Sequence, residues 1–136
     1  GLVVAATMIK TPWSVSGAML LMISHGLVSS ALFCLANTSY ERTNSRTMMI
    51  LQGSQVMLPL AAAWWLLSTM LNMALPPSTN FMGELLILTS VFKWSTYSIT
   101  LAGLGIIFTT TYSLYLFWSS QREYLPSHLK SMPPTT

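Results

Sequence analysis

Three long windows without charge constrain what this chain can fold into. Its nine charged residues leave 11–40, 47–83 and 94–121 uncharged. Each window is longer than the roughly 20 residues that a helix needs to cross about 30 Å of hydrocarbon. Only 7% of the residues are charged, whereas soluble domains have about 25%. The sequence therefore excludes a soluble all-α domain and predicts an all-α, polytopic bundle of transmembrane helices in a lipid bilayer.

Composition and motifs argue against several classes of function. The net charge of +3 is small and dispersed, and no basic stripe points to nucleic acid as a partner. The single cysteine, Cys34, excludes an internal disulfide and a Cys-cluster metal site. Walker, GxGxxG, HExxH and CxxC motifs are absent from the sequence. We therefore expect no metal or cofactor to be held by this chain.

Turn residues and polar segments divide the chain into expected spans. Lys10, Thr11 and Pro12 form a turn after a partial first span. The expected units are 1–9 (partial span), 14–36, 48–75 with 80–92 (a broken helix), 97–118, a polar loop over 37–47 and a polar tail over 119–136. The chain begins inside a hydrophobic run, so we expect it to be a fragment of a longer polytopic protein.

The stretch ALPPSTN interrupts the second charge-free window. Pro76 and Pro77 lack backbone donors, and their rings clash with a preceding helical turn. Thr79 or Asn80 is the expected cap of the helix that follows.

The length of that following helix leaves two interpretations open. A piece over 80–92 would extend only about 20 Å, which is too short to cross a bilayer. Either 48–75 is a full span followed by a re-entrant stub, or 56–92 is one discontinuous span. Broken helices are tolerated in bilayers only where protein or water satisfies the freed backbone groups, and transporters use them at binding sites.

Glu84 lies within two turns of this break. An ionised acid at the centre of a bilayer costs roughly 2.5–3.5 kcal/mol on insertion scales. Desolvation favours the protonated acid and a neighbouring cation favours the carboxylate, so a site with both can load and release a proton. The alternative is an interfacial acid that reaches the lipid headgroups. The adjacent break favours a proton carrier.

His25 lies near the middle of the expected span 14–36. Histidine exchanges protons near neutral pH, so His25 and Glu84 together indicate a proton relay. A neutral histidine that bonds a neighbouring helix explains the same position equally well. The distance between His25 and Glu84 cannot be obtained from their spacing in the sequence.

The distribution of Lys and Arg predicts an orientation. If the spans each cross once, one side holds four positive residues and the other holds two, Lys10 and Lys93. The four are Arg42, Arg46, Arg122 and Lys130. The side with four should be the cytosolic or matrix face.

Four segments, in order and over nearly the whole chain, carry a resemblance to a known family. They are TPWSVSGA, MISHGLVSSALFCLANTSYERTNSRTM, WWLLSTMLNMALPPSTNFMGELLIL and TTTYSLYLF. They closely resemble the mitochondrial NADH–ubiquinone oxidoreductase chain 4 family, which is related to subunits of cation/proton antiporters. The resemblance implies many helical spans with two discontinuous helices, PPSTNFMGE being part of the second. It implies that Glu84 ends a row of buried ionisable residues, with His25 on the same axis.

The resemblance also implies a role. The chain would be part of a subunit of respiratory complex I, a multi-pass protein of the mitochondrial inner membrane. It would contribute to proton translocation coupled to electron transfer from NADH to ubiquinone. Other subunits would be its partners and would use FMN, iron–sulfur clusters and ubiquinone. The fragment lacks further spans of the family and would not pump alone. The alternatives are a structural subunit that carries no protons and a stand-alone cation/proton antiporter.

Overall fold

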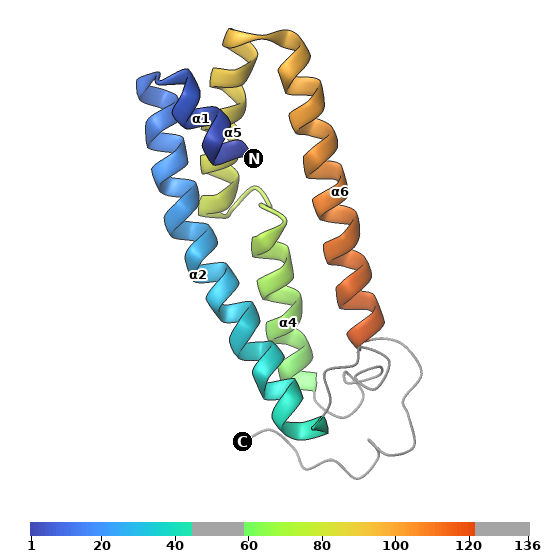
Figure 1. Cartoon of the computed structure of the whole chain (residues 1–136). Coiled ribbons are helices and arrows are strands. Elements are labelled where there is room, and N and C mark those ends of the chain that lie inside the picture. Colours follow the sequence, from blue (N-terminus) through green and yellow to red (C-terminus); the bar gives the residue numbers. More distant parts are fainter. Residues whose placement is uncertain (45–58, 122–136) are drawn as a thin grey trace.

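The computed structural model describes residues 1–44 and 59–121. Every element in these ranges is an α-helix, which confirms the predicted all-α fold (Figure 1). The helices are α1 (Leu2–Ile9), α2 (Pro12–Thr43), α4 (Pro59–Asn72), α5 (Thr79–Trp94) and α6 (Thr96–Gln121). The expected loop residues 45–47, the first part of the expected span 48–75, and 122–136 of the expected tail lie outside the described residues.

Helix α2 begins earlier than the expected span 14–36 because its first turn is fully capped. The Thr11 hydroxyl accepts from the Ser14 amide at 3.3 Å, and the Thr11 amide donates to the Ser14 hydroxyl at 3.0 Å. This reciprocal pair is a capping box. Pro12 occupies the first helical position, where its missing N–H leaves no bond unmade.

Helix α2 also continues where the sequence analysis predicts a polar loop. Residues 37–43 are helical, so the loop prediction is wrong there. No Pro or Gly interrupts this stretch, and the Asn37 side chain donates to Glu41 at 3.1 Å along the helix face. The helix ends at Asn44, whose left-handed backbone (φ 54°) lets its amide bond the Tyr40 carbonyl at 2.7 Å. At 1.5 Å per residue α2 is about 48 Å long, so its polar last turns can extend beyond the hydrocarbon.

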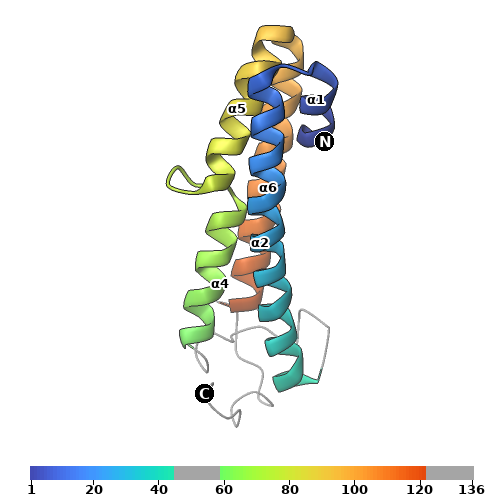
Figure 2. The same cartoon turned by 90° about the vertical axis from the view of Figure 1, so that its left-hand side faces the viewer.

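Helices α4 and α5 lie end to end beside α2, separated by a short loop (Figures 1 and 2). Helix α5 is about 24 Å long and does not cross a bilayer alone, whereas α5 and the described part of α4, about 21 Å, are together long enough. This end-to-end arrangement agrees with the predicted discontinuous helix, whereas residues 48–58 of the alternative full span lie outside the described residues. Within α2 and α6, the segments Pro12–Arg42 and Thr96–Ser119 are each long and apolar enough to cross a membrane.

The contact between α2 and α5 is the most extensive helix contact in the described part of the chain. Its buried apolar residues are Ala18 and Leu21 of α2 and Ile87 and Val91 of α5, and Ala6 of α1 completes the cluster. The two backbones come closest at Gly17 and Gly83. A Cβ on Gly17 would lie 2.9 Å from the Leu86 Cβ, and one on Gly83 would lie 3.1 Å from the Leu21 amide nitrogen. Glycine is required here because the helices cross without room for a side chain.

The last two helices differ from expectation only at their ends. Helix α5 extends the expected 80–92 to Thr79 and Trp94, and α6 extends the expected 97–118 to Thr96 and Gln121. Residues 119–121 are therefore helical rather than part of a polar tail. Helix α6 packs on α5 and α4, and most of its large apolar side chains are exposed. In a membrane protein such side chains face lipid or neighbouring helices.

Candidate functional site at the helix break

Helix α4 ends in the loop before α5, where Ala74 has a left-handed backbone conformation. The Met73 amide still bonds the Thr69 carbonyl at 3.0 Å, and the Ala74 amide bonds the Leu71 carbonyl at 3.2 Å. Ala74 has φ 55°, a conformation that closes the last turn of many helices but is unfavourable for a residue with a Cβ. Pro76 and Pro77 follow as predicted, and they prevent the helix from resuming at once.

Ser78, rather than Thr79 or Asn80, caps α5. Its hydroxyl accepts from the Phe81 amide at 3.3 Å and donates to the Leu75 carbonyl at 2.7 Å. Its backbone is extended (φ −92°, ψ 153°), as the geometry of an N-cap requires. The sequence-based cap assignment is wrong because Thr79 is already the first helical residue.

Asn80 instead links three segments at the break. Its amide nitrogen donates to the Leu71 carbonyl of α4 at 3.0 Å, and its amide oxygen accepts from the Ser24 hydroxyl of α2 at 2.5 Å. Both Asn80 and Ser24 are buried. The Leu71 carbonyl thus accepts from both the Ala74 amide and the Asn80 side chain, so protein satisfies the backbone at the break, as an interrupted membrane helix requires.

Glu84 lies one turn beyond Asn80 on α5 and directly after Gly83. Its side chain is half-buried. Within residues 1–44 and 59–121, no hydrogen bond or ion pair holds its carboxyl group. Along α5, Glu84 is about 15 Å from Trp94 at 1.5 Å per residue. If Trp94 lies at the membrane interface, as tryptophans commonly do, Glu84 lies near the middle of a 30 Å hydrocarbon layer.

His25 follows Ser24 on α2 but is exposed in this structure. In the described ranges no hydrogen bond joins it to Glu84. The structure does bring their neighbours together, because the Ser24–Asn80 hydrogen bond lies beside His25 on α2 and one turn before Glu84 on α5. About 6 Å along α5 separates that bond from the level of Glu84.

Sequence reasoning misses the pairing of Ser24 with Asn80. Both are polar residues in apolar runs, which is a visible signal, yet 56 positions separate them. Only the register of α2 against α5 brings them together. The described residues contain no group of three or more His, Cys, Asp or Glu that could hold a metal ion.

In this bundle an interrupted membrane helix carries one acid beside its break. Ion-translocating membrane proteins have this architecture. Residues 1–110 match the family model described as NADH:quinone oxidoreductase/Mrp antiporter, TM. The chain belongs to this family of transmembrane proteins.

Individual relatives agree with the family. The chain is 58% identical to NADH-ubiquinone oxidoreductase chain 4 of Squalus acanthias over 135 residues, and 56% identical to that of Scyliorhinus canicula. Each match covers 99% of this chain and 29% of the relative, so the chain spans less than a third of their length. A chain of respiratory complex I from Thermus thermophilus with bound NADH is 27% identical, with a TM-score of 0.90, 99% of this chain covered and 28% of that chain.

Proposed function

We propose that this chain forms part of the proton-translocating membrane arm of respiratory complex I. In this proposal it lies in the mitochondrial inner membrane, with other subunits of the complex and lipid as its partners. Proton movement through it is coupled to electron transfer from NADH to ubiquinone. Family membership, the names of the similar chains and the similarity to a complex I chain support this proposal.

The placement of Glu84 is the observation that carries the proposal. The residue is half-buried in an interrupted helix, one turn from the break, and none of the described residues supplies a cation to it. An ionised carboxylate at this depth is costly, whereas a carboxyl group that accepts and passes on a proton is ionised only transiently. Glu84 is accordingly the proposed exit-side proton carrier.

His25 is the proposed relay partner of Glu84. No hydrogen bond joins the two side chains in the described ranges, so a proton must cross intervening polar groups or water. The Ser24–Asn80 hydrogen bond supplies such groups between α2 and α5, next to His25 in the sequence and one turn before Glu84. Imidazole suits this role because it exchanges protons near neutral pH.

Redox chemistry belongs, in this proposal, to other subunits with FMN, iron–sulfur clusters and ubiquinone. The residues of this chain do not fit an iron–sulfur cluster, which requires several cysteine thiolates, because the sequence contains Cys34 alone. No step of the proposed proton pathway passes through a cofactor.

Replacing Glu84 with Gln in the intact complex tests the proposal. The amide keeps the shape of the side chain but cannot carry a proton. Coupled NADH oxidation should fall on the order of tenfold or more, and the ratio of protons moved to electrons transferred should fall with it. Glu41→Gln is the matched control, because Glu41 is exposed near the end of α2.

Two outcomes would contradict the proposal. An unchanged rate and proton-to-electron ratio in E84Q, with an infrared carboxylate signal of Glu84 that stays fixed during turnover, would indicate a structural subunit. Sodium-dependent proton flux in vesicles without NADH would indicate a stand-alone cation/proton antiporter.

A further inference from the structure

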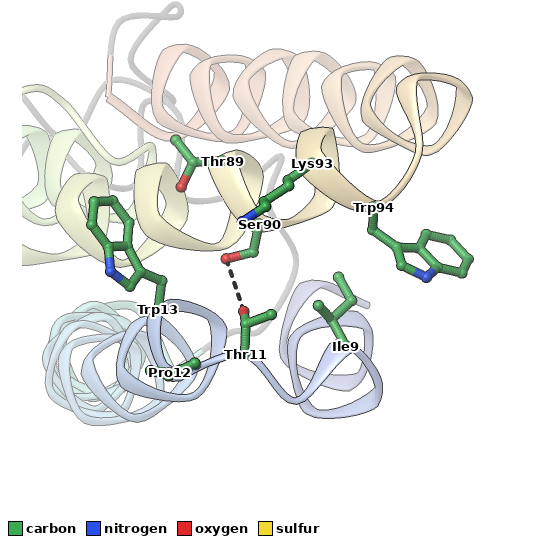
Figure 3. Close-up of a pocket in the computed structure, with 8 residues that line it drawn as sticks. All are labelled: Ile9, Thr11, Pro12, Trp13, Thr89, Ser90, Lys93 and Trp94. Carbon is green, nitrogen blue, oxygen red and sulfur yellow. Dashed lines mark hydrogen bonds between the residues drawn. The ribbon is translucent and has the colours of Figure 1, made fainter.

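A cavity of about 550 Å³ lies at one end of the bundle, between the α1–α2 turn and the last turns of α5 (Figure 3). This volume is within the roughly 300–1,000 Å³ of small-molecule sites in proteins. Thr11 and Trp13 line it from α2, and Ser90, Lys93 and Trp94 line it from α5. The cavity is separate from the helix break, which lies further along both helices.

Polar groups line part of this cavity. The Thr11 hydroxyl donates to the Ser90 hydroxyl at 3.5 Å and so connects α2 to α5. The Ser90 hydroxyl in turn donates to the Leu86 carbonyl at 3.0 Å. The Thr11 oxygen also accepts from the Ser14 amide, and the Ser90 oxygen accepts from Thr11, so each oxygen keeps one lone pair for an incoming donor.

The donors around the cavity are suited to an anion. Lys93 carries the single charge in the lining, and no acidic residue contributes to the lining. Trp13 and Trp94 each carry an indole N–H, and in Figure 3 they lie on opposite sides of the Thr11–Ser90 pair. Within the described residues neither indole nor the Lys93 ammonium has a hydrogen bond or ion pair to protein. The Lys93 ammonium matches the oxygens of a phosphate.

The position of the cavity indicates where such an anion comes from. Trp13 and Trp94 are 63% and 70% exposed, and Lys93 lies in the last turn of α5. Exposed tryptophans and a lysine at the ends of membrane helices lie at the level of the lipid headgroups. The cavity therefore opens where phospholipid phosphates are concentrated and where acyl chains can extend along the apolar helix faces.

We propose that this cavity binds the headgroup of a membrane phospholipid. The Lys93 ammonium pairs with the phosphodiester, and Trp13 and Trp94 lie on either side of the Thr11–Ser90 pair. The Thr11 and Ser90 oxygens accept hydrogen bonds from a headgroup hydroxyl or ammonium. Phosphatidylglycerol supplies both an anionic phosphate and hydroxyl donors, which makes it the probe of choice. This site does not depend on Glu84 carrying protons.

Photolabelling of the intact complex tests the site. The complex is incubated with phosphatidylglycerol that bears a diazirine near the glycerol, then irradiated, and labelled peptides are mapped by mass spectrometry. Labelling should concentrate in residues 9–13 and 89–94. Lys93→Gln removes both the attraction of one surface lysine, worth about fivefold, and the pairing inside the cavity, so it should lower labelling by more than about fivefold. Lys10→Gln is the matched control, because Lys10 lies in the adjoining turn but does not line the cavity. It removes the surface attraction alone, so its effect should not exceed about fivefold.

Three results would overturn the proposal. Equal, Lys93-independent labelling by a diacylglycerol with the same diazirine would show that an apolar groove alone is occupied. Displacement of the lipid probe by inorganic phosphate would identify a site for free phosphate instead. Absence of label from both peptides in the intact complex would show that protein covers the cavity.

Discussion

Asn80 is the residue on which the geometry of the break most depends. Its side chain donates a hydrogen bond to the Leu71 carbonyl and accepts one from the Ser24 hydroxyl, and it is only 3% exposed. Asn80→Ala removes both bonds and leaves a small void. We expect the free energy of unfolding to fall by about 1–3 kcal/mol. The measurement is the rate of thermal inactivation of the purified complex.

A second asparagine supplies the control for this experiment. Asn37 is exposed on α2 and makes one hydrogen bond to Glu41 along the helix face. Asn37→Ala should change stability by less than about 0.5 kcal/mol, as is usual at the surface. Equal inactivation rates for the two variants would mean that Asn80 does not hold the break together.

The sequence alone locates those residues of this site whose side-chain type differs from that of the residues around them. Glu84 and Pro76 are identifiable because an acid or a proline is conspicuous in an apolar run. The N-cap of α5 cannot be identified from the sequence, because Ser78, Thr79 and Asn80 are all good N-cap residues. The choice among them is made by the loop, whose path gives Ser78 the extended backbone of a cap.

At the scale of helices, the crossing of α2 over α5 fixes the position of Glu84. A Cβ on Gly83 would lie 3.1 Å from the Leu21 amide nitrogen and 3.2 Å from the Gly17 carbonyl oxygen. Both are backbone atoms, so the helices must separate to admit it. Gly83→Ala should destabilise the complex by about 1–3 kcal/mol, as overpacking does, and should lower the proton-to-electron ratio by displacing Glu84. Thermal inactivation and pumping assays measure the two effects.

Gly26→Ala separates crowding from the general effect of a glycine in a helix. Gly26 is on α2, and a Cβ there would have nothing within 4 Å. Because alanine favours helix by roughly 0.5–1 kcal/mol over glycine, this variant should be neutral or slightly more stable. A loss of stability in Gly26→Ala as large as in Gly83→Ala would refute close packing as the cause.

Helix ends were harder to predict than helix existence. Charge-free windows locate membrane helices because hydrocarbon excludes charge. They do not say where a helix stops in water, since the polar residues after Ala36 disfavour helix by no more than about 0.7 kcal/mol each. Helix α2 therefore runs on to Thr43, until Asn44 adopts a left-handed backbone.

At the scale of the whole molecule, the charged ends of the helices define a direction across the membrane. The α1–α2 turn with Lys10 and the last turn of α5 with Lys93 lie at one end of the bundle (Figure 1). The last turn of α2, with Arg42, lies at the other end. The remaining members of the predicted positive side, Arg46, Arg122 and Lys130, lie outside the described residues. Placement of the Arg42 end on the matrix side therefore depends on counting these three residues with Arg42, and it stays a prediction.

Single cysteines at the two ends of α2 test this orientation. In a Cys34→Ala background, Glu41→Cys and Lys10→Cys each place one thiol at an exposed position. A membrane-impermeant maleimide added to inverted vesicles, which expose the matrix face, should label Glu41→Cys and not Lys10→Cys. Vesicles of the opposite orientation should give the reverse result, because α2 is about 48 Å long and both of its ends reach water. Labelling of both thiols from one face would show that α2 does not cross the membrane, and an exchanged pattern would show that the charge rule assigns the wrong face.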